Sequence, residues 1–479
     1  MNFDSLLFLV LLGVTLIVAW VIADYRWRVR VLLGVSYVFY ATWDARFLVL
    51  FIWLTLLAWG GALLLAGLSG RNRRLMLWGI LVLLLVPLAF FKYFNFLGES
   101  ITELMRVTSF EQRWAAYDIV LPVGISFFTF HAISYVLDVH AGRLRPDLSI
   151  SRIGLYLAFF PHLIAGPIVR ATDFLPQVRV GWEAPTRLIM AGALGRFAWG
   201  MFKKVILADR LALTVVDPVF AQPELASATL IVLAIIAFGL LIYADFSGYS
   251  DMAIASAAML GIRFRENFHA PYLATSIRDF WRRWHISLSS WIRDYVYIPL
   301  GGSRSGSESR TAANLLMAMT LCGLWHGAAW TFVAWGMLHG LAIVGERFLV
   351  PRLPASRLWP LVSWCVTTLI VFTSWALFRA NNFDVLAALI AGLLGEADVY
   401  IHKAVWVFVV MAALILYAEQ AVLMLWPAVA ERPGVVALAR KWISRSISLR
   451  ILIATTLTVL LLLLHYPQLG GRNFIYFQF

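Results

Sequence analysis

The sequence has few charged residues for its length. Only 14% of its 479 residues are Asp, Glu, Lys or Arg, and 62% are hydrophobic, whereas a soluble domain has about 25% charged and about 45–50% apolar residues. This balance excludes a soluble globular enzyme, a disordered chain and a fibrous repeat. Uncharged runs of about 18 or more residues are typical of membrane-spanning helices. The sequence has such runs at 5–23, 47–70, 119–137, 225–244, 311–345 and 358–378.

Cysteine is also scarce, and several catalytic motifs are absent. The two cysteines, Cys322 and Cys365, lie in apolar runs and have neither disulfide nor zinc spacing, so we expect no metal site. The sequence lacks GxxxxGK[ST], HExxH, GxGxxG and GxSxG, which argues against ATP-driven transport, zinc proteolysis and serine-hydrolase chemistry. Acidic residues are rare near the apolar runs, where we note Asp245, Asp251 and Glu419. A proton-coupled transporter is therefore disfavoured, because such proteins usually carry a carboxylate relay.

The positive charge is placed as in a membrane protein. The net charge is +13, but no Lys/Arg stripe lies on a soluble module, so we expect no nucleic-acid partner. Basic residues instead fill short loops, where they set orientation. They predict about twelve spans with both termini outside, and a basic cytoplasmic segment at 431–450. Segment 153–169 has basic flanks and predicts a re-entrant hairpin. With no repeat or linker, we expect one membrane domain over residues 1–479.

His326 is the strongest candidate for chemistry. It lies inside run 311–345, and ionisable residues within apolar runs are functional candidates. A neutral imidazole can take a proton from a hydroxyl group. In the alternative interpretation, Gly323-xxx-Gly327 and Gly336-xxx-Gly340 are helix-packing motifs and His326 and His339 only form hydrogen bonds across an interface. Cys322, four residues before His326, is either a nucleophile for an acyl-thioester or, more commonly, a small packing residue.

A second candidate region begins at Arg278. Four of its residues recur at helical spacing and predict an amphipathic helix at the membrane interface: Trp281, Trp284, His285 and Leu288. One interpretation is an aromatic belt with snorkelling arginines. In the other, His285 faces the protein interior while Arg278, Arg282 or Arg283 contacts an anionic donor on the cytoplasmic side.

Several blocks of sequence resemble the membrane-bound O-acyltransferase (MBOAT) family. They are 159–168, 245–251, 279–291, 297–302 and 324–327. The resemblance is densest over residues 155–340, and within the family it points to the bacterial branch that acetylates alginate. The branches that acetylate peptidoglycan or transfer D-alanine are related to it.

The resemblance implies an all-α polytopic membrane fold with an MBOAT-like core at about 119–345, about 12 spans, and re-entrant and interfacial helices. It implies two catalytic histidines, His326 and His285, with His326 as the base and His285 orienting the donor or stabilising the oxyanion. The cofactor-binding candidates are Arg278, Arg282 and Arg283. No cofactor would be bound permanently; the donor would be a thioester of acetyl-CoA or of an acyl carrier protein.

The resemblance also implies a function and a location. The function is O-acetylation of an extracytoplasmic, alginate-like polysaccharide, at the bacterial inner membrane among membrane lipids. Nothing in the sequence resembles an esterase-type domain, so a periplasmic acetyltransferase partner is expected. The alternatives are a component of peptidoglycan or cellulose O-acetylation and, in another class, a non-catalytic transporter of an acyl donor or lipid.

Overall fold

The described part of the chain is all-helical. The computed structural model describes residues 3–106, 114, 116–164, 166–304, 306–349, 357–395, 401–430, 455–458 and 460, and these contain helices, turns and loops but no strand. The predicted cytoplasmic segment 431–450 lies outside the described residues. The chain divides into two compact units, Met1–Ala193 with Ala253–Arg265 and Leu194–Met252 with Glu266–Phe479. The expectation of one membrane domain with a core at about 119–345 stays a prediction.

Six helical stretches among the described residues are long and apolar enough to cross a bilayer. They are Tyr25–Ala66, Gly70–Arg106, Ala228–Met259, Trp330–Leu349, Trp359–Arg379 and Lys403–Leu425. The prediction of a multi-pass helical membrane protein is confirmed, while the count of about twelve spans stays a prediction. Runs 5–23 and 119–137 yield helices of only 16 residues each, shorter than the about 20 residues that a crossing needs.

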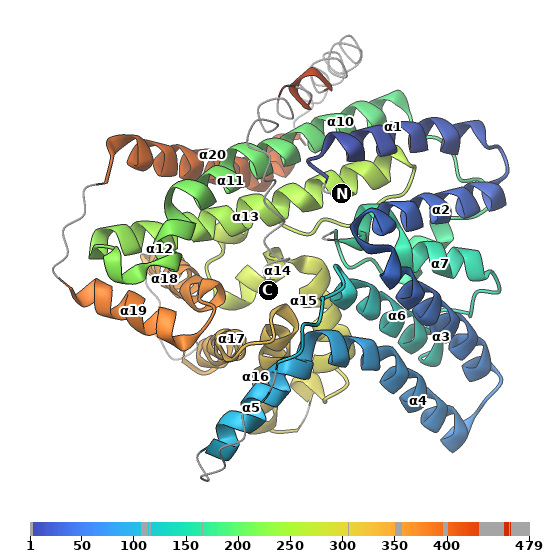
Figure 1. The fold of residues 1–479 in the computed structure, drawn as a ribbon, viewed down its shortest axis with the longest axis horizontal. Coiled ribbons are helices and arrows are strands. Elements are labelled where there is room, and N and C mark those ends of the chain that lie inside the picture. Colours follow the sequence, from blue (N-terminus) through green and yellow to red (C-terminus); the bar gives the residue numbers. More distant parts are fainter. Residues whose placement is uncertain are drawn as a thin grey trace. The chain divides into compact units, whose positions relative to one another are not determined.

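The helices of the first unit are drawn mostly in blue to teal in Figure 1, and aromatic side chains pack between them. Its helices are α1 (Leu6–Val21), α2 (Tyr25–Asp44), η1 (Ala45–Phe47), α3 (Leu48–Ala66), α4 (Gly70–Leu88), η2 (Ala89–Tyr93), α5 (Phe94–Arg106), α6 (Ile125–His140), α7 (Ile150–Ala158), α8 (Phe160–Leu163), α9 (Ala171–Phe174) and η3 (Leu175–Gln177). Phe8, for example, contacts both Phe39 and Phe160 edge-on. Helix α3 packs against α4, α6 and α7.

Segment 153–169 does not form one crossing helix. Its described residues belong to α7, to the four-residue α8 and to loop. Pro161 explains the break, because proline fits the first turn of α8 but cannot donate the backbone hydrogen bond that a continuing α7 would need. Both helices are buried, as irregular backbone in a membrane protein must be.

The second unit contains the candidate histidines. Its helices are η4 (Lys203–Ala208), α11 (Asp209–Leu211), η5 (Ala212–Val216), α12 (Asp217–Ala221), η6 (Pro223–Leu225), η7 (Pro271–Leu273), α14 (Ile277–Arg283), α15 (Ile286–Ile292), η8 (Arg293–Tyr297), η9 (Gly302–Arg304), α16 (Glu308–His326), α17 (Trp330–Leu349), α18 (Trp359–Arg379), α19 (Phe383–Leu394) and α20 (Lys403–Ala430). Most residues of α10 (Arg187–Phe202) and α13 (Ala228–Met259) also belong to it.

Run 311–345 forms a tight pair of helices, α16 and α17, which lie side by side (Figure 1). A Cβ atom on Gly323 would overlap with the carbonyl oxygen of Phe332, and one on Gly336 would overlap with that of Met319. Only glycine therefore permits this approach of the two backbones. The helix-packing interpretation of these glycines is confirmed, and the hairpin places His326 at the end of α16.

The predicted amphipathic helix through Trp281 and Leu288 is wrong. The helix stops after Arg283, and α15 begins at Ile286. His285 adopts a left-handed conformation with φ 42° and ψ 54°, and the backbone N–H of Ile286 donates to the carbonyl of Asn267 rather than within a helix. Trp281, Trp284, His285 and Leu288 are all buried, so this surface faces the protein interior and not the membrane interface.

Candidate active site

The structure brings the two predicted histidines together. The ring centroids of His285 and His326 are 6.4 Å apart, and both side chains are buried. Trp325 contacts both rings, at 6.0 Å from His285 and 4.9 Å from His326. Trp335 and Phe378 pack against His326 at 5.2 and 5.4 Å. This aromatic surrounding keeps water away from a reacting group.

Asn267 determines the tautomer of His285. The amide oxygen of Asn267 accepts from the backbone N–H of Ser287 at 3.2 Å, and its nitrogen donates to Ser250 Oγ at 3.0 Å. A backbone N–H can only donate, so this oxygen is an acceptor. His285 Nδ1 lies 3.2 Å from the same oxygen and must therefore carry the proton. Nε2 of the neutral ring is left with its lone pair, as an acceptor.

His285 is both strained and uncharged. A left-handed backbone is uncommon for a residue other than glycine, and such outliers cluster at functional sites. Burial lowers the pKa of His285 to about 3, so the ring is neutral at pH 7. A group with such a low pKa is a weak general base, since bases work best with a pKa near the operating pH.

His339 and Cys322 fit structural roles. Ser374 Oγ donates to the carbonyl of Val371, so His339 Nε2 donates to Ser374 Oγ at 3.0 Å. His339 Nδ1 then accepts from Trp281 Nε1 at 3.3 Å, which occupies both ring nitrogens. Cys322 is buried near the C-terminal end of α16, where the helix dipole disfavours the thiolate that a nucleophile requires.

An arginine-lined pocket lies near the histidines. It has a volume of about 480 Å³, and four arginines line it: Arg278, Arg282, Arg293 and Arg347. Two of these, Arg278 and Arg282, were predicted from the sequence. Arg283 was predicted too, but it does not line the pocket and is instead paired with Asp279 at 2.9 Å. Arg293 and Arg347 come from η8 and α17, a convergence that sequence spacing does not reveal.

Two aromatic rings lie between the pocket and His326. Trp281 lines the pocket and lies 5.7 Å from Trp335, and Trp335 in turn packs on His326. The guanidinium groups of Arg293 and Arg347 are paired with Asp294 and Glu308, whereas Arg278 and Arg282 form no ion pair among the described residues. Two exposed cations are thus available to an anionic ligand.

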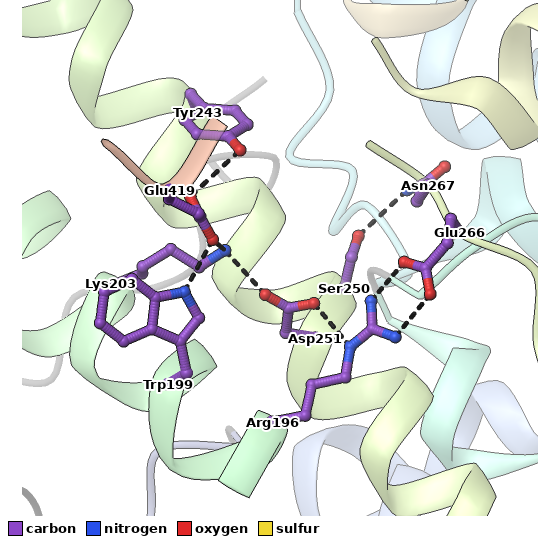
Figure 2. A network of polar contacts seen from close by, with 9 residues as sticks. All are labelled: Arg196, Trp199, Lys203, Tyr243, Ser250, Asp251, Glu266, Asn267 and Glu419. Atoms are coloured by element: carbon purple, nitrogen blue, oxygen red, sulfur yellow. Dashed lines mark hydrogen bonds and ion pairs between the residues drawn. The ribbon is translucent and has the colours of Figure 1, made fainter. Parts of the chain in front are cut away.

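A buried charge network lies in the same unit (Figure 2). Lys203 Nζ contacts Asp251 at 2.7 Å and Glu419 at 2.8 Å, and Glu419 also accepts from Trp199 and Tyr243. These groups line a cavity of about 620 Å³. Asp251 and Glu419 stand out in the sequence as rare acidic residues near apolar runs, but their pairing with Lys203 was not predicted. The useful signal was Lys203, a cation in an otherwise apolar segment that needs a buried partner.

The network also fixes the residues that hold His285. Arg196 binds Asp251 at 2.7 Å and both carboxylate oxygens of Glu266, at 2.7 and 2.5 Å. Asp251 follows Ser250, and Glu266 precedes Asn267 (Figure 2). A bidentate arginine is geometrically demanding, so Arg196 holds the end of α13 and the following loop at the separation that the Ser250–Asn267 hydrogen bond requires.

Comparison with known proteins identifies the family. Residues 141–379 match the model of the membrane-bound O-acyltransferase family, MBOAT. The chain is 42% identical over 390 residues to the "Probable alginate O-acetylase AlgI" of Pseudomonas aeruginosa, covering 80% of this chain and 73% of that protein. It belongs to the MBOAT family.

Two further relatives extend the comparison. The "Probable alginate O-acetylase AlgI" of Azotobacter vinelandii is 40% identical over 404 residues, covering 83% of this chain and 79% of that protein. The "Peptidoglycan O-acetyltransferase" of Helicobacter pylori is 32% identical over 402 residues, covering 75% and 72%. The chain is thus a multi-pass MBOAT O-acyltransferase, and both of its candidate histidines lie within the matched residues.

Proposed function

We propose that this protein moves an acetyl group from a cytoplasmic thioester across the bacterial inner membrane for O-acetylation of an alginate-like polysaccharide. The relatives named as probable alginate O-acetylases are 38–42% identical to it, compared with 32% for the peptidoglycan O-acetyltransferase. These identities favour an alginate-like acceptor over peptidoglycan. Cellulose, the other alternative, has no support among these relatives.

The observation that carries the proposal is the pairing of two buried histidines beside an arginine-lined pocket. The pocket offers Arg278 and Arg282 to the phosphates of the donor, since guanidinium groups bind phosphate through paired hydrogen bonds. Coenzyme A and the phosphopantetheine arm of an acyl carrier protein both carry phosphate. The rings of Trp281 and Trp335 then separate this anionic end of the donor from His326.

His326 acts as the general base. It removes the proton from the acceptor hydroxyl while the oxygen attacks the thioester carbonyl. The C–S bond breaks, and the proton passes from His326 to the leaving thiolate, so the step needs no other reactant. Proton transfer of this kind contributes about 10²–10⁴-fold to a rate.

His285 orients the donor. Its Nδ1–H is directed to Asn267, so Nε2 accepts a hydrogen bond, for example from an amide N–H of the pantetheine arm. A neutral ring in this tautomer has no second N–H to offer an oxyanion. The orienting role is therefore favoured over the oxyanion-stabilising role that was the other expectation.

A separate periplasmic acetyltransferase completes the proposal. The donor is made in the cytoplasm and the polymer is outside, so a partner must receive the acetyl group and deliver it. The partner supplies the acceptor hydroxyl at His326 or takes the ester formed there.

The test uses the full chain in liposomes that contain acetyl-CoA with a labelled acetyl group. The partner and polymer are added outside, and both free thiol and labelled ester are measured. We expect His326→Ala to abolish both products. His269→Ala is the matched control, because His269 is an exposed histidine of the same unit, and it should retain activity.

The outcomes separate an enzyme from a transporter. A His326→Ala protein that is inserted and still produces labelled ester at the normal rate contradicts the role of His326. Movement of intact acetyl-CoA across the membrane, with no thiol released, would support a non-catalytic transporter. Replacing alginate with peptidoglycan or cellulose in the same assay tests the acceptor.

A further inference from the structure

A second basic hollow lies in the first unit. It has a volume of about 280 Å³ and is formed where α2 begins and where the chain enters α7. Three arginines line it: Arg26, Arg30 and Arg152. No acidic side chain is among its lining residues. It is therefore a candidate site for an anion.

Two of these arginines contact aromatic rings, Arg26 on Tyr25 and Arg30 on Trp27. Arg152 is paired with Asp147 at 2.7 Å, whereas within the described residues Arg26 and Arg30 form no ion pair with a carboxylate. Arg28, between them, is different: it is buried and donates to the carbonyls of Trp182 and Ile22. The start of α2 thus uses one arginine internally and presents the other two at the hollow.

The hollow also contains hydroxyl groups. Ser149 and Ser151 line it, and their Oγ atoms are 3.3 Å apart. Ser149 Oγ accepts from the backbone N–H of Arg152 and caps α7, so its own O–H can donate. Guanidinium and hydroxyl donors together are the usual partners of a phosphate group.

The rim of the hollow is apolar and exposed. Leu148, which lines the hollow, is an apolar side chain that is 81% exposed. Such side chains would be unfavourable in water but are well placed against the acyl chains of a lipid. Trp27, over which the Arg30 guanidinium lies at 4.7 Å, is also exposed, as aromatic residues often are at a membrane interface.

We propose that this hollow binds the phosphate of an anionic phospholipid headgroup, with the lipid's acyl chains along the exposed apolar rim. Basic pockets on the cytoplasmic side of membrane helices are suited to such headgroups, and the apolar rim favours a lipid over a soluble phosphate. The site lies outside the acetyl-transfer chemistry, so its test is independent of the proposed function.

The experiment measures lipid selectivity of the full chain. The protein is placed in nanodiscs of phosphatidylcholine with phosphatidylglycerol, and the lipids retained are counted by native mass spectrometry. We expect phosphatidylglycerol to be enriched. Because each basic residue contributes about fivefold near an anionic surface, Arg26→Gln or Arg30→Gln should reduce enrichment about fivefold and the double variant about 25-fold.

Three controls make the result decisive. Arg46→Gln, in η1 directly after α2 and paired with Asp44, should leave enrichment unchanged. The Arg26→Lys/Arg30→Lys variant keeps the charge and should retain most of the enrichment. If the glutamine double variant unfolds, phosphatidylglycerol enrichment is measured instead in the lysine variant and in wild type at increasing salt concentration. Enrichment should fall with salt in both, because salt weakens a contact between a basic side chain and a headgroup.

Two results would overturn the proposal. One is equal phosphatidylglycerol enrichment in wild type and in the folded glutamine double variant, or no salt dependence. The other is displacement of the lipid by inorganic phosphate at equal concentration, which would assign the hollow to a soluble phosphate compound.

Discussion

Replacing Asn267 with leucine removes the oxygen that holds His285 in one tautomer. Three donors lose their acceptor: the backbone N–H and Oγ–H of Ser287 and the Nδ1–H of His285. A buried donor without an acceptor costs about 1–3 kcal/mol. Partners that orient a functional histidine are typically worth about 10–100-fold. We therefore expect kcat of acetyl transfer to fall about 10–100-fold while KM for the donor changes less.

The aspartate variant at the same position separates orientation from folding. Asn267→Asp keeps an oxygen acceptor for Nδ1–H and preserves the tautomer, so it should retain most of kcat. Its carboxylate also raises the pKa of His285, so activity should fall on the acidic side at a higher pH than in wild type. The readouts are kcat, KM and the pH–rate profile, with melting temperature measured in parallel.

The matched control is Asn314→Leu. Asn314 is another buried asparagine of the second unit, and it donates to the carbonyl of Gly302 rather than to a histidine. It should lose stability but not kcat per folded molecule. A folded Asn267→Leu protein with wild-type kcat and an unchanged pH profile would refute the positioning of His285 by Asn267.

Three other changes test the packing and electrostatics. Gly336→Ala forces α16 and α17 apart and should cost about 1–3 kcal/mol, seen as a lower melting temperature; an unchanged value would contradict the close helix contact. Lys203→Met leaves Glu419 without a cationic partner among the described residues and Asp251 with Arg196 alone. It should cost about 3–5 kcal/mol, measurable by chemical unfolding, with Arg46→Gln as a neutral control. The folded-state pKa of His285, about 3, lies below its unfolded value of about 6.5, so the unfolded chain binds more protons between these values. The free energy of unfolding should therefore fall as pH drops from about 6.5 towards 3, by up to about 1.4 kcal/mol per pH unit, and His285→Gln should lack this component; identical pH slopes in the two proteins would argue against it.

The charge network adds a connection between stability and activity. Arg196 joins Asp251 and Glu266, whose chain neighbours Ser250 and Asn267 are hydrogen-bonded to each other. Asn267 in turn accepts from His285. The loop that holds His285 is therefore braced by ion pairs and not by regular secondary structure. This bracing explains how a residue in a left-handed backbone conformation keeps one orientation between two short helices.

The sequence by itself determined the class of the protein and its two candidate histidines. Long uncharged runs require helices, because a backbone in lipid must satisfy its own hydrogen bonds. Glycine spacing predicted the approach of α16 and α17, and an ionisable group in an apolar run marked His326. These signals are local, so they are readable without the fold.

Only the tertiary structure decided the surroundings of those residues. The periodicity around Trp281 predicted a continuous helix, but a hydrogen bond from Ile286 to the distant Asn267 breaks it at His285. Likewise, Lys203 and Glu419 are far apart in the chain, yet they meet in the second unit. Such pairings depend on contacts between residues far apart in the sequence, in which an opposite charge offsets the cost of burying an ionised group. The spacing of residues along the sequence does not predict these partners.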